Sequence, residues 1–182
     1  MIDFLSSPLN QWIWDAAQTV SIIVGFVFVY RQIRLAGYQN SITHLNYFRD
    51  LWKSEQLMRA RGTLWDRPID REIDFLGHED VLATFMNDLG LAVATNQADR
   101  QHVYSYFGYY VEGHWLVLGP KILRYRERMS DPNFFANFEK LYRTVQEINT
   151  KSSSLPMRPG HAADFLIQEK VLADFMLGRD GA

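Results

Sequence analysis

The longest apolar run of the chain lies close to its first residue. From Trp12 to Tyr30 the sequence reads WIWDAAQTVSIIVGFVFVY, about 19 residues that would rise roughly 28 Å as a helix, close to the thickness of a bilayer's hydrocarbon core. Asp15 and Gln18 fall in its first turns, within reach of the headgroup region, and no charged residue occurs from Thr19 to Tyr30. The pattern predicts a helix that spans a membrane once.

The ends of this run favour an uncleaved anchor. Trp12, Trp14 and Tyr30 lie at its two ends, where amphipathic rings settle at membrane interfaces. The preceding residues contain no Lys or Arg, which the first part of a cleaved signal peptide would require. Gly25 lies inside the span and by itself predicts no helix dimer.

Basic residues on one side of the run predict its orientation. Arg31 and Arg34 follow it directly. Because Lys and Arg are enriched on the cytoplasmic side, we expect the N-terminus outside and the main domain in the cytoplasm. The alternative is the buried central helix of a soluble bundle, which the polar Asp15 and Gln18 and a mean hydropathy of -0.21 favour.

Beyond the span, apolar positions recur at three- and four-residue steps, which predicts further helices. The expected segments are residues 39–65, 81–93, 103–122, 134–148 and 162–177. Asp99 would cap the third of these, and the sequence from Ser130 to Pro132 would begin the fourth. Gly37 would mark a bend after the span, and Pro120 a kink or a break.

No strand-like alternation competes with these helices, and the residues from Asp66 to Gly77 are typical of an irregular connection. The expected fold class is therefore all-α, with an N-terminal transmembrane helix, an antiparallel helical bundle and a C-terminal docking helix. The expected parts are a membrane anchor at 1–35, a helical bundle domain at 36–150, and a linker with the C-terminal helix at 151–182.

The last predicted helix has an apolar stripe too wide to remain in water. It follows a polar stretch rich in Ser, Pro and Gly, which is typical of a linker. The favoured interpretation is that the helix returns onto its own bundle. The alternative is that it binds a partner protein or a second copy of the chain. The candidate docking residues are Phe165, Ile167, Val171, Leu172, Phe175 and Met176.

Composition excludes several classes of protein. The formal charge is -2, from 19 basic and 21 acidic residues, so no overall field favours nucleic acid. With no cysteine, the chain has no disulfide, thiolate metal site or cysteine nucleophile. The hydrophobic fraction of 47% is ample for a buried core.

No motif predicts catalysis, a cofactor or a metal site. No Glu is followed three residues later by His, and the chain has no Gly-rich phosphate loop, HExxH motif or nucleophile elbow. Glu112 and His114 lie two residues apart, so on a helix they point away from each other. Together with Asp88 they are the polar candidates for an alternative function, a membrane-proximal enzyme that acts on a lipid or a small metabolite.

A basic cluster ends the third helix of the expected bundle. Its members are Lys121, Arg124, Arg126 and Arg128. The favoured interpretation is a solvated helix end, where cations complement the helix dipole. The alternative is that the cluster, with Arg31 and Arg34, faces anionic lipid headgroups, each charge contributing on the order of 1 kcal/mol.

Two stretches carry a resemblance to a known family. FRDLWKSEQLMRARGTLW, from Phe48 to Trp65, and the stretch from Tyr106 to Tyr142 resemble a bacterial family of unknown function. The likeness covers roughly Trp12 to Ile148 and leaves out Lys151 onward. It implies one N-terminal membrane anchor in the bacterial inner membrane and a helical cytoplasmic domain, and it implies no activity.

The leading functional hypothesis is a non-enzymatic, single-pass membrane protein that acts as an accessory, scaffold or regulatory subunit through protein contacts. Its expected partners are membrane lipid and another protein or a second copy of itself. Besides the enzyme named above, an effector that oligomerises through its anchor remains as a third hypothesis.

Overall fold

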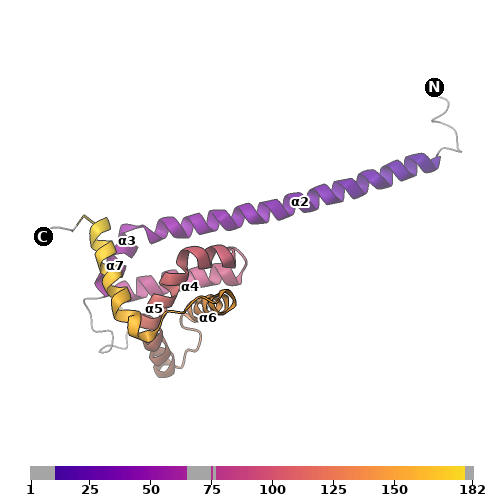
Figure 1. Cartoon of the computed structure of the whole chain (residues 1–182). Helices are drawn as coiled ribbons and strands as arrows, with labels where there is room; N and C mark the ends of the chain where they lie inside the picture. Colours follow the sequence, from indigo (N-terminus) through magenta and orange to yellow (C-terminus); the bar gives the residue numbers. More distant parts are fainter. Residues whose placement is uncertain (1–10, 65–74, 76, 179–182) are drawn as a thin grey trace. The chain divides into compact units, whose positions relative to one another are not determined.

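The chain is helical throughout the residues that its computed structural model describes, which are 11–64, 75 and 77–178. The helices are α2 (Gln11–Trp52), α3 (Glu55–Thr63), α4 (His78–Ala94), α5 (Arg100–Met129), α6 (Ala136–Ser152) and α7 (Ala162–Met176), with a short 3₁₀ helix, η3 (Pro159–His161), before α7 (Figure 1). Within these residues there is no strand. The predicted all-α, bundle-like fold is confirmed.

The chain divides into two compact units, Met1–Asn40 and Ser41–Ala182. The boundary lies inside α2, a few residues after the predicted end of the anchor at 35. The second unit holds α3 to α7, so the C-terminal helix belongs to the same compact unit as the rest of the bundle.

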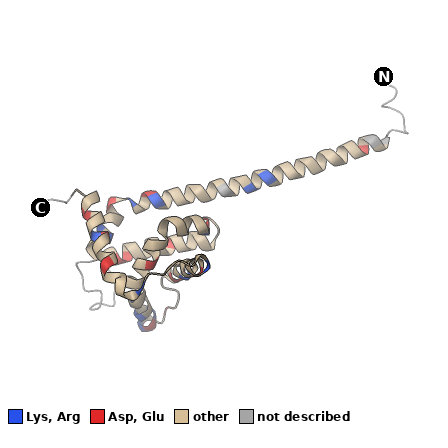
Figure 2. Cartoon of the chain, in the orientation of Figure 1, with Lys and Arg blue, Asp and Glu red and all other residues tan. Residues whose placement is uncertain are grey.

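The part of α2 in the first unit exposes its apolar side chains. It contains an 18-residue window apolar enough to cross a membrane, and none of that window is buried in the protein. Figure 2 shows a long stretch of this helix without charged residues. The hydroxyls of Thr19 and Ser21 donate to the carbonyl oxygens of Asp15 and Ala17, which satisfies them inside the helix. The alternative of a buried central helix would require burial of this window, and none of it is buried in the structure described.

The predicted helix over residues 39–65 is two helices. α2 ends at Trp52, and α3 begins after Ser54, whose hydroxyl accepts a hydrogen bond from the Leu57 amide. A side chain that caps a new helix competes with continuation of the old one, which explains the break. Gly37, by contrast, lies within the uninterrupted α2, and Trp65 is outside the described residues.

The core of the second unit uses the apolar stripes that the sequence predicts. α4 packs against α6, α3 against α4 and α7, and α5 against α6. The fully buried large side chains include Leu82, Met86, Leu89, Val103, Phe107, Val111, Leu118, Ile122 and Phe138. Trp52, at the end of α2, lies among the rings of Phe85, Phe107 and Tyr110.

Three residues were predicted to begin or interrupt a helix, and the structure confirms one of these predictions. Asp99 caps α5 as expected, because its carboxylate accepts from the His102 amide at 2.9 Å. Ser130 does not begin a helix: it ends α5 in the left-handed conformation, and α6 starts at Ala136 after a turn. A kink or a break was predicted at Pro120, and the break does not occur, since α5 continues from Arg100 to Met129 with Pro120 inside it.

Candidate functional site

The candidate site lies along the contact of α7 with α3 and α5, where Figure 1 shows the C-terminal helix in yellow. Two glycines allow this approach. A Cβ at Gly113 of α5 would lie 2.3 Å from the Phe165 ring, and one at Gly62 of α3 would lie 3.0 Å from Ala173. Phe165 is therefore part of the protein's own core, and its prediction as a partner-docking residue is wrong.

A buried ion pair holds α7 to α3. The Arg61 guanidinium donates from Nε to Glu169 Oε2 at 2.5 Å and from Nη2 to Oε1 at 3.0 Å. Its carbon Cζ lies 4.1 Å from the centre of the Trp52 ring and 5.3 Å from that of Tyr110. Both charged side chains are almost fully buried. The two-pronged geometry and the aromatic face together satisfy an arginine that has lost its water.

His114 lies beside this pair and is fully buried. Its Nδ1 lies 2.8 Å from the Tyr110 carbonyl oxygen, an acceptor, so Nδ1 carries the proton. Nε2 is then a lone-pair nitrogen, 3.7 Å from Glu169 Oε2 and without a hydrogen-bond partner among the described residues. Burial lowers the pKa of His114, and the nearby Glu169 charge opposes that shift. His114 is thus a neutral side chain at neutral pH.

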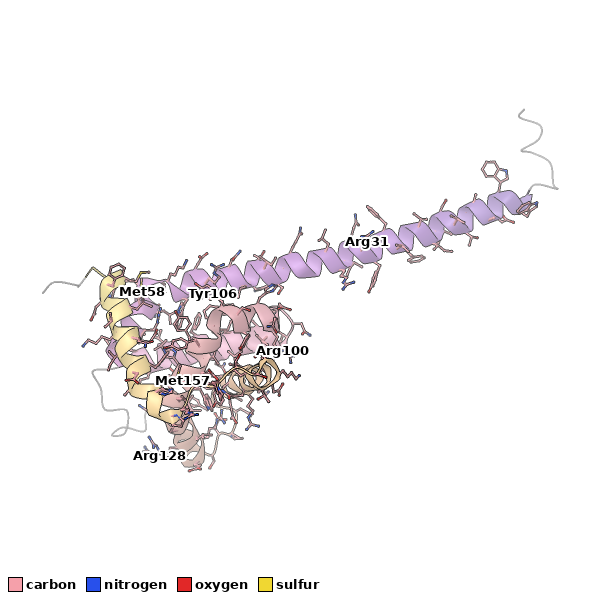
Figure 3. The ribbon with its side chains drawn as sticks, in the orientation of Figure 1. Arg31, Met58, Arg100, Tyr106, Arg128 and Met157 are labelled. Carbon is pink, nitrogen blue, oxygen red and sulfur yellow. The ribbon has the colours of Figure 1, made fainter. Side chains whose placement is uncertain are left out.

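An open cavity of about 370 Å³ lies on another side of α5. It is bounded by α5, by residues 155–157 and η3, and by the first turns of α7, and Met157 is labelled in Figure 3. Its lining residues are Tyr109, Glu112, Leu155, Pro156, Met157, His161, Asp164, Phe165 and Gln168. A smaller cavity of about 130 Å³ lies beside Arg61 and includes Met58 and Tyr106, also labelled there.

Glu112 supplies the buried carboxylate of the larger cavity. Its Oε1 accepts from the side-chain amides of Gln146 and Asn149, and Asn149 in turn accepts from the Tyr104 hydroxyl at 2.7 Å. Its Oε2 is 3.4 Å from the Met157 amide. Burial raises the pKa of Glu112, and these hydrogen bonds reduce the rise without cancelling it.

The polar residues singled out from the sequence do not come together. Glu112 faces the cavity and the amides of α6, whereas His114 faces Trp52 and Glu169. Asp88 is exposed on α4. Residues two apart on a helix are turned about 200° from each other, which explains the separation. The alternative of a membrane-proximal enzyme with these three residues as one polar site is therefore wrong.

The predicted basic cluster is also divided. Lys121 is buried and pairs with Glu79 of α4, with its ammonium 5.2 Å from the centre of the Phe75 ring. Its prediction as a membrane-facing cation is wrong, because a buried, paired ammonium cannot face lipid headgroups. Arg126 donates to the Phe134 carbonyl and to Glu139. Arg124 and Arg128 are exposed on the last turns of α5, and Arg128 is labelled in Figure 3.

Sequence reasoning missed the residues that organise the site. Arg61, Glu169, Gln146 and Asn149 are all polar side chains that lie on a core-facing side of their helices. One signal was available for Glu169. It occurs four residues after Phe165 and four before Ala173, on the stripe that α7 buries, where an acidic residue requires a partner.

These observations define a class: an all-helical protein with one candidate membrane span and a compact helical unit. The chain belongs to the family described as a domain of unknown function (DUF4760), which matches residues 19–145. The match runs from α2 into α6 and ends before α7. The predicted membership of a family of unknown function is confirmed. No curated protein and no solved structure matched the chain.

Proposed function

We propose that this protein is a single-pass membrane protein of the bacterial inner membrane, which holds a helical domain in the cytoplasm as an accessory, scaffold or regulatory subunit. The observation that carries the proposal is the uncovered apolar half of α2. Large side chains from Val20 to Leu35 are half or more exposed, including Phe26 at 72% and Phe28 at 63%. A continuous apolar surface of this kind requires a lipid or protein environment.

The orientation is supported by the charges at the end of the span. Arg31 and Arg34 are exposed and follow the last residue of the uncharged stretch. Lys and Arg within a few residues of a span keep that end in the cytoplasm. The helical unit, which begins at Ser41, then lies on the same side as these arginines.

The absence of cysteine makes the orientation directly testable. A single cysteine at Ser7 should react with a membrane-impermeant maleimide added to intact spheroplasts. A matched single cysteine at Ser105, which is exposed on α5, should react only after the membrane is opened. The reverse labelling pattern would overturn the orientation. Release of the full chain into the soluble fraction, together with a variant that lacks residues 1–35, would overturn the span.

Binding of another protein, or of a second copy, is supported by the outer side of α7. Burial of Phe165, Leu166, Glu169 and Ala173 leaves five large apolar side chains exposed on this helix, with Val171 at 61% and Phe175 at 66%. The five are Ile167, Val171, Leu172, Phe175 and Met176. Such residues at three- and four-residue steps suit a helix that packs against a groove or another helix.

A site-specific crosslinking experiment tests this binding. A photo-crosslinking residue at Val171 should give an adduct of discrete mass in cells, and the same residue at Ala163, exposed on the first turn of α7, should not. Adding Phe175→Glu should remove the adduct, because a carboxylate would be desolvated at the contact. An adduct that survives Phe175→Glu, or none at Val171, would contradict a subunit role through α7.

A further inference from the structure

The cavity beside Glu112 has the size and composition of a small-molecule site. Its volume of about 370 Å³ falls in the range of ligand pockets, and it would hold on the order of ten non-hydrogen atoms at about 30 Å³ each. Apolar groups form much of its wall, notably Leu155, Met157 and Phe165. The ligand it suits is therefore small, with an apolar part.

The charged residues that line the cavity favour one sign of charge on the ligand. Glu112 and Asp164 supply two carboxyl groups, and none of the lining residues is Lys or Arg. The lining also contains one imidazole, that of His161, and the Arg61 guanidinium elsewhere in the unit is paired in two-pronged fashion with Glu169. Among the lining residues, a cation would find two carboxyl groups, whereas an anion would find no Lys or Arg and only the His161 imidazole.

Glu112 has one oxygen that remains open to a ligand. Oε1 already accepts two amide hydrogen bonds, but the only donor near Oε2 among the described residues is the Met157 amide at 3.4 Å, beyond the usual range for a good N–H···O bond. The residue as a whole is only 7% exposed. A buried carboxylate with an open oxygen gains more from an ammonium than a solvated one does.

Aromatic rings add a second source of attraction. Phe165 and Tyr109 both line the cavity, with ring centres 5.4 Å apart in an edge-to-face arrangement. The Tyr109 hydroxyl donates to Gln168 Oε1, which holds its ring in place at the cavity wall. The face of an aromatic ring attracts a cation within about 6 Å of its centre.

We propose that this cavity binds a small organic amine in its ammonium form, attached to an aryl or alkyl body. The ammonium lies at Glu112 Oε2, and the apolar body packs against Phe165, Met157 and Leu155. The ligand then contacts both α5 and the first turns of α7, so binding strengthens the contact between these helices. This inference does not depend on the proposed subunit role, because the α7 residues that line the cavity, Asp164, Phe165 and Gln168, are not among the five apolar residues of its exposed stripe.

Three ligands that share one phenylbutyl group and differ in charge test the proposal. Full-length protein in a non-ionic detergent is titrated with 4-phenylbutylamine, with the neutral 4-phenylbutanol and with the anionic 4-phenylbutyrate, and binding is followed by calorimetry. The amine should bind at least about tenfold more tightly than the alcohol, since a hydrogen bond to a charged group exceeds a neutral one by about that factor. Equal binding of all three, preference for the anion, or no binding of the amine would overturn the proposal.

Two variants and a control locate the binding. Glu112→Gln keeps an oxygen for the amides of α6 and removes the charge, so amine affinity should fall about tenfold or more and alcohol affinity should not. Asp164→Asn changes an exposed residue in the first turn of α7, and it should weaken the amine severalfold. Glu147→Gln, an exposed carboxylate on α6, is the control and should leave binding unchanged. Full amine affinity in both cavity variants would place the amine elsewhere and overturn the proposal.

A headgroup probe separates a free amine from a lipid. Phosphocholine carries an ammonium and a phosphate, and the lining has no Lys or Arg to pair with that phosphate. It should therefore fail to displace 4-phenylbutylamine. Displacement would overturn the assignment to a free amine and assign the cavity to a lipid headgroup.

Discussion

Arg61 and Glu169 place two charges in a part of the molecule that the surrounding helices shield from water. The attraction between such charges is offset by the loss of their hydration, so the pair as a whole contributes little net stability. Removing one partner is different, because the other charge is then left buried without compensation. The pair also restricts how α7 docks, since a two-pronged hydrogen bond requires one register.

Glu169→Leu should lower the free energy of unfolding by about 3–5 kcal/mol. Adding Arg61→Met should recover most of this loss, because no charge is then buried. The measurement is urea unfolding of the full chain in detergent, followed by tryptophan fluorescence, to which Trp52 under the guanidinium contributes. Glu55→Gln, in the exposed pair with Arg59, is the control and should change stability by about 0.5 kcal/mol or less. A double variant as unstable as the single one would contradict this account.

His114 should make the protein less stable in mild acid. Burial lowers its pKa in the folded state below the ordinary 6.5, so the unfolded chain binds a proton first as the pH falls. The stabilising contribution is complete above about pH 6.5 and is lost below it, by at most about 1.4 kcal/mol per pH unit. Glu112 acts in the opposite sense, because its raised pKa gives stability that is lost as the pH rises through it.

The two effects are separated by comparing the protein with His114→Gln. Both contain Glu112, so only the histidine contributes to the difference in unfolding free energy between them. That difference should be constant from about pH 8 to pH 7 and should shrink below about pH 6.5. A difference that stays constant down to pH 5 would mean that His114 keeps its ordinary pKa in the folded protein.

At the scale of the elements, α4 and α6 approach each other closely at Gly90. A Cβ at this glycine would lie 2.2 Å from the Asn137 carbonyl oxygen, so the two backbones touch. The Asn137 amide donates to Asn87 Oδ1 of α4 at 3.1 Å, which adds a polar contact to the same place. Since α6 begins at Ala136, this contact positions the start of the helix.

Gly90→Ala should therefore destabilise the protein by about 1–3 kcal/mol, measured by the same unfolding experiment. Helix propensity alone predicts the opposite, a gain of about 1 kcal/mol when alanine replaces glycine in a helix. Gly37→Ala is the matched control, because a Cβ there meets nothing within 4 Å and only the propensity effect applies. A stabilised Gly90→Ala would show that α4 and α6 are not in backbone contact.

α7 is packed on one side and exposes apolar side chains on the other. Its buried side is built from Phe165, Leu166, Glu169 and Ala173, which occur at steps of one, three and four residues. The periodicity of the sequence predicted that this helix must dock, and its favoured interpretation was a return onto the bundle. It did not separate the docking residues from the exposed ones, because the apolar stripe is wider than the face that α3 and α5 can cover.

For the molecule as a whole, the proposed membrane location depends on the uncharged stretch of α2. If it spans a bilayer, Ile23→Arg places a charge near the middle of the span and should cost about 2.5–3.5 kcal/mol of insertion. Fractionation should then show the variant shifting from membranes to the soluble or degraded pool. Gln18→Arg, near one end, is the control and should remain in the membrane, because its side chain reaches the interface. Equal retention of both variants would contradict a span centred on this stretch.

The amino-acid sequence by itself determined the helical class, the apolar run near the start, the core stripes, the Asp99 cap and the family. All of these depend on short-range patterns, in which residues three or four positions apart share a helix face. Local patterns were less reliable at the boundaries, where Ser54 and Ser130 are both plausible caps and only Ser54 begins a helix.

Only the tertiary structure decided the charged partners and the cavity. Arg61 and Glu169 are 108 residues apart, and Lys121 and Glu79 are 42 apart, so no periodicity links them. Their pairing depends on which helices pack together and on how closely they pack. Glycines at positions such as 113 and 90 permit this close packing. A buried charge requires a partner, but the physics of burial does not say from which helix that partner comes.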